Sequence, residues 1–484
     1  MNITEGLSFD DVLVIPSYSE VLPQEINTKT VLAGNITLNV PVISAAMDTV
    51  TEEELAIAMA LEGGAGVIHM NLSPEEQARQ VGRVKRFLNW IIDRPVTVDK
   101  NEIITNAIGL MEKHGISGLP VLDNDKLCGI LTRRDLRFLD NHNKKVEEVM
   151  THDLITESES VNIESAQTKF NKHRIEKLPV IDQNGKLVGL ITVKDLEKHH
   201  QFPDATLDKK GRLIVGAAVS PLDYTKRMPL LIQNKVDFVV VDTAHGDSKN
   251  VLSAVSDIKK NYPNICVIGG NTATREGTKN LIDAGADAVK VGVGPGSICT
   301  TRIVAGIGMP QFSAILECAA EAEKSRIPVI ADGGIKYSGD ITKAIAAGAA
   351  TVMIGNLFAG LKEAPGREII FEGRMFKAYR GMGSIGAMSE GSGDRYQKVS
   401  GNAVVPEGIE GRVPYKGDLQ PFLYQLVSGL KKGMGYCGCS NIGELRKYKK
   451  FVKITAAGLK ESHAHDVYIT QEAPNYSMKY GGSY

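Results

Sequence analysis

A cysteine at the exit of a glycine-rich loop is the residue of this sequence best suited to do chemistry. The apolar run 286–291 leads into a loop with glycine at positions 292, 294 and 296, and Cys299 follows. Glycine lets the backbone turn sharply and approach a ligand closely. A thiol in such a polar loop, shortly after a strand, is where an activated nucleophile is expected. A tight turn around an inert buried thiol also explains the pattern, and the spacing matches neither a Rossmann nor a P-loop fingerprint.

The elements that must position this loop are short apolar runs separated by helical stretches. Residues 52–62 carry Leu, Ile and Met at helical spacing, with acidic residues near the start. Apolar runs separated by helices predict parallel strands buried on both faces. Eight candidate strands can be counted: 40–47, 64–69, 213–219, 237–243, 265–270, 286–293, 327–334 and 350–355. This number predicts an α/β fold of the (β/α)8 TIM barrel type, and a doubly wound open sheet is the competing fold.

Polar and glycine residues collect where these runs end. They are Ser44, Met47, His69, Asp242–Gly246, Asn271, Gly292–Cys299, Asp332–Gly334 and Gly355–Asn356. In a TIM barrel the carboxyl ends of the strands form the active-site face, and the loops after the last two strands often hold phosphate. The last two groups fall at those places, and their glycine amides can point at an anion. We therefore predict a phosphate ester as substrate.

An internal repeat interrupts the barrel pattern. Residues 116–136 align with residues 175–196, and each copy ends in Thr-x-Arg/Lys-Asp. Paired repeats of this size usually stack around a shared core. We predict an inserted module at 91–202, with copies at about 94–140 and 147–200, between barrel parts 1–90 and 203–484. The pattern resembles a tandem CBS (Bateman) module, which implies adenine nucleotides bound through Thr132, Asp135, Thr192 and Asp195. A structural insert whose Thr and Asp cap helices is the alternative.

The chain becomes rich in glycine and serine after the barrel. Residues 378–417 form a stretch far longer than an ordinary connection, which is typical of a lid or a linker. Arg395, Tyr396 and Glu407 favour a lid, which we place at about 384–412. Near the end, residues 461–463 could be an ordinary polar terminus or a subunit contact.

Composition limits the partners and the compartment. Lys and Arg number 56 against 57 Asp and Glu, a net charge of −1, so no overall electrostatic case exists for nucleic acid or an anionic membrane. No apolar run approaches a membrane span, and the acidic start is not a signal peptide. Six cysteines in 484 residues do not make a disulfide framework. Cys437 and Cys439 lack a second ligand pair for a metal. We predict a cytoplasmic protein with Cys299 as a thiol.

Several motifs together resemble the inosine-5′-monophosphate (IMP) dehydrogenase and GMP reductase family. They are SFDDVL, VISAAMDTVTE, DTAHG, GPGSICTTRIVAG, ADGGI, YRGMGS, DRYQ and VPEGIEGRVPYKG. The resemblance covers nearly the whole chain, and the tandem CBS insert stands at its expected place. The cysteine loop is shared by both branches of the family. The length, the insert and the Asp-Arg-Tyr segment favour the dehydrogenase branch.

The resemblance implies a covalent mechanism. Cys299 would attack C2 of the hypoxanthine ring of IMP, and NAD would accept the hydride. Water would then hydrolyse the covalent intermediate to xanthosine 5′-monophosphate. In the family a mobile flap supplies the general base, here Arg395 with Tyr396 beside it, although arginine is normally always protonated. Thr301 with Glu407 is the family's second route to an activated water.

The resemblance also implies ligand contacts. For IMP they are Ser44, Met47, Ser297, Asp332, Gly334, Gly355, Asn356, Tyr379, Gly381, Met382, Gly383 and Glu407. For NAD they are Asp242, Asn271, Gly292 and Gly294. For a potassium ion they are the carbonyls of Gly294, Gly296 and Cys299, with Glu461, Ser462 and His463 of a neighbouring subunit. The shared potassium site implies a homotetramer, or an octamer if CBS modules also pair. At the CBS module, guanine nucleotides could compete with adenine nucleotides.

Three positions depart from the family pattern. Asn356 stands where the family usually has serine, Asp247 replaces a histidine and Ser220 replaces a glycine. The larger Asn356 puts that phosphate contact in question. Two other functions stay open, a GMP reductase that uses NADPH and a non-catalytic adenine-nucleotide sensor. The presence of Cys299, Arg395 and Asp332 argues against the sensor.

Overall fold

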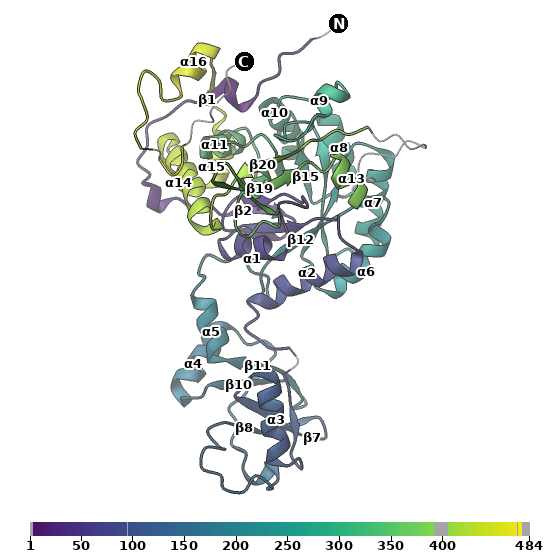
Figure 1. Ribbon diagram of the computed structural model, residues 1–484, viewed down its shortest axis with the longest axis vertical. Helices are drawn as coiled ribbons and strands as arrows, with labels where there is room; N and C mark the ends of the chain where they lie inside the picture. The colour runs from purple at the N-terminus through teal and green to yellow at the C-terminus, as the bar shows by residue number, and fades with distance from the viewer. Residues whose placement is uncertain (1–2, 94, 392–404, 472, 477–484) are drawn as a thin grey trace. The chain divides into compact units, whose positions relative to one another are not determined.

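The computed structural model describes residues 3–93, 95–391, 405–471 and 473–476 (Figure 1). The chain divides into two compact units. One consists of Met1–Phe87 with Asp204–Tyr484, and the other is Leu88–Pro203. The insert expected at 91–202 falls inside the second unit.

The first unit is built on a closed barrel of eight parallel strands. The strands run in the order β12, β13, β14, β15, β16, β17, β4, β5. Their bounds are Val215–Val219, Phe238–Asp242, Cys266–Thr272, Ala288–Val291, Val329–Asp332, Thr351–Ile354, Val42–Ser44 and Ala65–Ile68. Each corresponds to one of the eight apolar runs, so the barrel prediction is confirmed. The strands before the insert close the ring, because β4 pairs with β17 and β5 pairs with β12.

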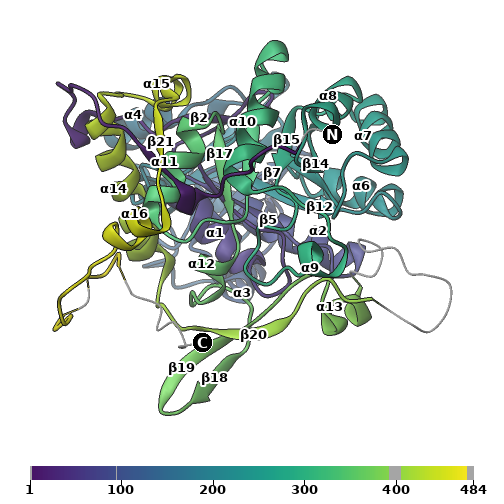
Figure 2. The ribbon, with the colours of Figure 1, turned by 90° about the horizontal axis from the view of Figure 1, so that it is seen from above.

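Helices cover the outside of the barrel, as the view from above shows (Figure 2). They are α1 (Glu53–Leu61), α2 (Pro74–Phe87), α6 (Tyr224–Gln233), α7 (Lys249–Asn261), α8 (Arg275–Asp283), α10 (Gln311–Ala322) and α11 (Ser338–Ala346). Helix α7 is typical, because Val251, Ala254, Val255 and Ile258 repeat at helical spacing and are buried. At the start of α8, the Thr274 side chain accepts the Gly277 amide and caps the helix.

The inside of the barrel is filled by apolar side chains. Phe238, Val240, Ile268 and Ile330 belong to one buried cluster with residues of the hairpin β2 (Thr30–Ala33) and β3 (Ile36–Leu38). Thr30 Oγ1 also donates to the carbonyl of Ala350, just before β17. The inside of the barrel is therefore a packed core.

The remaining elements of the first unit extend the barrel. Strands β18 (Glu368–Phe371), β19 (Arg374–Arg380) and β20 (Glu410–Pro414) form an antiparallel sheet whose β18–β19 hairpin projects outward in Figure 2. The others are β1 (Val12–Val14), α9 (Thr301–Val304), α12 (Asn356–Ala359), α13 (Ile385–Glu390), α14 (Leu419–Cys437), α15 (Ile442–Tyr448), β21 (Phe451–Lys453) and α16 (Ala456–Glu461). Among the described helices, none is both long and apolar enough to cross a membrane.

The second unit shows the sequence repeat as a repeated topology. The first copy contains β6 (Val98–Asp99), α3 (Ile104–His114), β7 (Gly118–Asp123) and β8 (Lys126–Thr132). The second contains β9 (Glu157–Ser158), α4 (Ile163–His173), β10 (Lys177–Ile181), β11 (Leu187–Thr192) and α5 (Val193–His200). Each copy has its own three-stranded sheet and its own buried cluster. Trp90 and Ile91 pack into the second cluster, so the module begins a few residues before the repeat itself.

Candidate active site

The loop after β15 presents Cys299 at the carboxyl end of the barrel. Gly292 adopts φ +151°, and a Cβ there would lie 2.1 Å from the carbonyl oxygen of Asp332. Only glycine allows the two loops to approach so closely. The Cys299 amide donates to the Gly296 carbonyl at 3.0 Å and closes the turn that carries the thiol. Cys299 is one of six described cysteines that are free and is half-buried.

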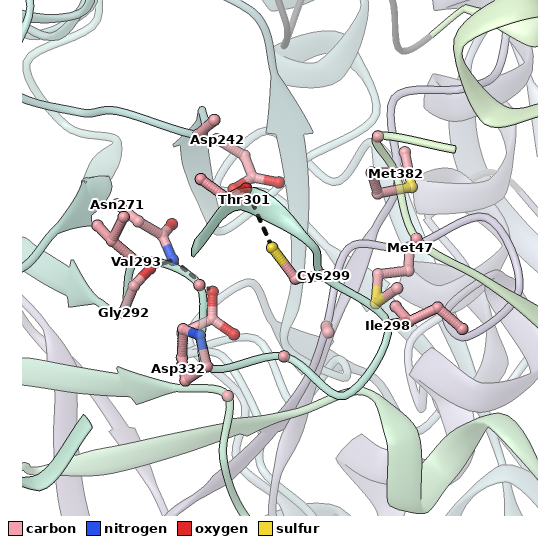
Figure 3. A pocket seen from close by; sticks show the side chains of 18 of the residues that line it. Met47, Asp242, Asn271, Gly292, Val293, Ile298, Cys299, Thr301, Asp332 and Met382 are labelled. Atoms are coloured by element: carbon pink, nitrogen blue, oxygen red, sulfur yellow. Dashed lines mark hydrogen bonds between the residues drawn. The ribbon is translucent and has the colours of Figure 1, made fainter. Parts of the chain in front are cut away.

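The thiol stands at the end of a hydrogen-bonded chain. Cys299 Sγ donates to Thr301 Oγ1 at 3.1 Å, and Thr301 Oγ1 donates to Glu407 Oε2 at 2.7 Å. Figure 3 shows the first of these bonds. The backbone fixes the arrangement, because the Thr300 amide donates to the Glu407 carbonyl at 2.9 Å. A thiol proton therefore has a path through one hydroxyl to a carboxylate.

Two carboxylates and an amide lie on one side of Cys299, and Met47 and Met382 lie on the other (Figure 3). Asn271 Nδ2 donates to the Gly292 carbonyl at 2.8 Å and to Asp332 Oδ2 at 2.9 Å. Asp242 ends β13 and is buried. The acidic and amide residues expected at the strand ends are thus brought together.

Sequence reasoning missed Lys290, which lies in the middle of this group. Its Nζ donates to Asp242 Oδ1 at 2.9 Å and to Asp332 Oδ2 at 2.6 Å, and it also contacts Asn271 Oδ1. The only signal was a single charged residue in the apolar run Ala288–Val291, which a search for buried strands passes over.

Two cavities that share part of their walls lie at the carboxyl end of the barrel, and Cys299 lines the first of them. The first, about 800 Å³, is lined by Met47, Asp242, Asn271, Gly292, Gly294, Gly296, Cys299, Thr301, Asp332, Tyr379, Gly381, Met382, Gly383 and Glu407. The second, about 1000 Å³, is lined by Met47, Gly296, Ser297, Asp332, Gly334, Gly355, Asn356 and Tyr379. Most residues assigned to IMP and NAD from the sequence therefore line one or both of these cavities.

Tyr379 contributes a polar group that is not ionised to both cavities. Tyr379, on β19, directs its hydroxyl toward Met47 Sδ at 3.9 Å. Burial raises the pKa of Tyr379 to about 12, so the phenol keeps its proton at neutral pH and can donate to a ligand oxygen. Next to it, Arg380 pairs with Asp48 at 2.8 Å. This ion pair, which the sequence did not suggest, ties the 381–383 loop to the loop after β4.

The second cavity is lined by the residues assigned to a phosphate from the sequence. Gly333 and Gly334 adopt φ +92° and +82°, and Asn356 begins the short helix α12. Asn356 lines the cavity, so the departure from the family serine lies at the wall where a phosphate is expected. The other two departures, Asp247 and Ser220, lie in loops that connect a barrel strand to the following helix. Asp247 accepts from Asn280 at 2.9 Å, and Ser220 Oγ accepts the Leu222 amide at 3.2 Å.

Some predicted residues lie elsewhere or outside the description. Ser44 is fully buried in β4, where its Oγ accepts from Thr51, and it is not among the described residues that line either cavity. Arg395 and Tyr396 fall outside the described residues. Glu461 ends α16, Ser462 Oγ donates to the Gly458 carbonyl, and the His463 ring contacts Tyr337.

The two Thr/Asp pairs of the second unit have different surroundings. Thr132 donates to Asp135 Oδ2 at 2.7 Å, and both line a cavity of about 890 Å³ with His173, Arg174 and Lys177 of the other copy. Thr192 donates to Asp195 at 2.5 Å, and its Oγ1 accepts the Asp195 amide and caps α5. The capping expected for a purely structural insert is therefore present at the second pair.

Relatives of similar length are 52–57% identical to this chain. IMP dehydrogenase from Aquifex aeolicus is 57% identical over 480 residues, and 98% of each chain is covered. The enzyme from Halalkalibacterium halodurans is 55% identical over 477 residues, and that from Bacillus subtilis is 52% identical over 479, again with 98% of each chain covered.

A solved structure is similar as well. GMP reductase from Trypanosoma brucei in complex with guanosine 5′-monophosphate has a TM-score of 0.83 and 41% identity. It covers 96% of this chain and 99% of its own. Length and insert therefore do not by themselves separate the two branches. The family model for the IMP dehydrogenase / GMP reductase domain matches residues 6–465, and the chain belongs to that family.

Proposed function

We propose that this protein acts as an IMP dehydrogenase, an NAD-dependent oxidoreductase that converts IMP and water to xanthosine 5′-monophosphate in guanine nucleotide synthesis. The observation that carries the proposal is the chain from Cys299 Sγ through Thr301 to Glu407, set in a cavity between buried carboxylates. The relatives that are 52–57% identical over their full length carry the name of this enzyme.

The first half-reaction forms and oxidises a covalent adduct. Cys299 Sγ bonds to C2 of the hypoxanthine ring, and its proton can pass through Thr301 to Glu407. The hydride leaves C2 for NAD, which holds it as NADH, and the purine remains bound to sulfur as a thioimidate. A thiolate is a far better nucleophile than a thiol, so this proton path serves the attack itself.

Residues around the thiol would hold the two nucleotides. The Asp332 carboxylate accepts hydrogen bonds from the IMP ribose, Gly334, Gly355 and Asn356 surround the phosphate, and Met382 and Gly383 meet the base. Asp242 accepts from the nicotinamide ribose, with Asn271 and Gly292 beside it. The proposed phosphate contacts line the second cavity, and the proposed contacts of the base and of the nicotinamide ribose line the first, where the two rings would have to meet.

The second half-reaction hydrolyses the thioimidate. Water attacks C2, the C–S bond breaks and the thiol is restored. Thr301 is hydrogen-bonded to the sulfur, and Glu407 is hydrogen-bonded to Thr301. A carboxylate accepts a proton far more readily than a guanidinium does. Arg395 and Tyr396 form the other route, after NADH has left.

The test is a product assay with both substrate pairs. IMP with NAD should yield NADH and xanthosine 5′-monophosphate, separated by chromatography. A GMP reductase is the second candidate, favoured by the Trypanosoma brucei structure. Consumption of NADPH in the presence of GMP, with no NADH formed from IMP, would assign the protein to that activity.

Removal of potassium is expected to lower turnover steeply, and adding it back should restore the rate. Carbonyl oxygens suit a hard cation. The Gly296 carbonyl accepts the Cys299 amide yet keeps a second lone pair, so an ion held there would order the cysteine turn. Initial rates with potassium and with lithium chloride at equal ionic strength measure the effect. Equal rates in the two salts would rule out a role of potassium in turnover. They would also take away the reason to expect Glu461–His463 to contact a neighbouring subunit of a homotetramer.

Replacing residues 88–203 by a short linker is expected to leave a folded, active enzyme. The residues that line both cavities lie in the first unit, and the second has its own cores. Circular dichroism and the product assay check this. A soluble, folded variant without activity would make the module part of the active site. In the full-length enzyme, ATP and GTP are expected to bind in the cavity that Thr132 and Asp135 line. We expect the protein to work in the reducing environment of the cytoplasm.

A further inference from the structure

Lys290 contacts residues of three other strands at the carboxyl end of the barrel. It lies on β15, and its ammonium group reaches Asp242 at the end of β13, Asn271 on β14 and Asp332 at the end of β16. The side chain is 2% exposed, that of Asp242 is 4% exposed and that of Asp332 is 19% exposed. Asp332 is thus the member that faces the cavity most openly.

Electrostatics explain why a lysine stands here. Two carboxylates this close in a dry site repel each other strongly, and their interaction grows as the local dielectric falls. One ammonium between them compensates most of that repulsion, and each hydrogen bond to it has a definite direction. The cation therefore fixes where both carboxylate oxygens point.

We propose that Lys290 is the positioning residue that aligns IMP and NAD with each other. This inference rests on the proposed function, in which Asp332 accepts from the IMP ribose and Asp242 from the nicotinamide ribose. The Lys290 ammonium holds the carboxylates of both Asp332 and Asp242, so it sets the relative placement of the two riboses. It thereby also sets the relative placement of the hypoxanthine and nicotinamide rings. Hydride transfer is sensitive to this placement, because a misplacement of about 1 Å costs on the order of 10²-fold in rate.

The chain offers a matched control at the opposite end of the barrel. Lys85 is buried, and its Nζ contacts Asp208 at 2.9 Å and Asp237 at 2.8 Å. Asp237 directly precedes β13, the strand that Asp242 ends. Lys85→Met therefore removes a buried ammonium from a pair of aspartates without touching either cavity, and it reports the structural cost of such a loss.

The test compares four variants with the wild-type enzyme. Lys290→Met should raise KM for both IMP and NAD by about 10- to 100-fold, the loss expected when charged hydrogen bonds are removed. IMP affinity, measured by titration calorimetry without NAD, should fall by a similar factor. Asp332→Asn should raise KM for IMP alone and Asp242→Asn that for NAD alone. Lys85→Met should lower the melting temperature and leave both KM values unchanged.

Three outcomes separate the possibilities. If Lys290→Met lowers only the melting temperature, as Lys85→Met does, Lys290 merely stabilises the barrel. If it raises KM for one substrate alone, the shared alignment is wrong. Should Lys290→Met not fold, Lys290→Arg keeps the charge but moves it, and it should raise both KM values by a smaller factor; unchanged values would overturn the proposal. A wild-type enzyme that binds IMP but forms no NADH would instead refute the proposed function.

Discussion

Replacing Cys299 by alanine is expected to abolish turnover of IMP while leaving IMP binding largely intact. Sulfur supplies the bond to C2, whereas the ribose and phosphate contacts come from the loops after β16 and β17. Steady-state NADH formation measures the first effect, and titration calorimetry with IMP measures the second.

Cys318 provides a matched control for this experiment. It is also a free thiol, and burial raises its pKa to about 12, so it is inert at neutral pH. Cys318→Ala should therefore keep wild-type turnover. Steady turnover of Cys299→Ala within about tenfold of wild type would remove Cys299 from the covalent step.

Replacing Arg395 by alanine is expected to slow hydrolysis far more than hydride transfer. In the proposed mechanism Arg395 acts only after NADH has left. Rapid mixing with IMP and NAD should show a burst of NADH stoichiometric with active sites, followed by a steady rate lower by about 10²–10⁴-fold, the usual range for general-base assistance. Mass spectrometry of the same samples should show purine mass on Cys299.

Glu407→Gln should be compared with Arg395→Ala in the same rapid-mixing experiment. Glu407 accepts from Thr301, which in turn contacts the sulfur, so its loss should slow the burst as well as the steady rate. An Arg395→Ala variant whose burst slows in proportion to its steady rate would place Arg395 before hydride transfer and refute the flap assignment.

The barrel could be predicted from sequence because each strand carries its own local signal. A strand buried on both faces, such as β13 (Phe238–Asp242), reads as an uninterrupted apolar run that ends in a polar residue. Glycines that permit a close approach, such as Gly292, are visible in the same way. Site residues that follow strands directly could thus be placed without knowledge of the pairing.

Interactions between distant segments could not be predicted in this way. The ammonium of Lys290 meets carboxylates 48 and 42 positions away in the chain, and the Arg380–Asp48 pair spans 332 positions. For Ser44, a motif match did not predict the contact that the side chain makes. Its motif matches the family, yet its hydroxyl is bonded to Thr51 inside the barrel wall. Periodicity says which face a residue occupies, but not which polar partner it finds there.

Closure of the barrel by its first strands has a consequence during synthesis on the ribosome. Strand β4 pairs with β17 and β5 pairs with β12, on the far side of the inserted unit. The insert is complete once Pro203 has been made, whereas the ring needs Ile354. At about 5–20 residues per second, the ribosome needs roughly 8–30 s to make the residues between these two points, and the nascent barrel has open strand edges, which are templates for aggregation, during that time. The inserted unit has its own buried clusters, so its folding does not need the strands that complete the barrel.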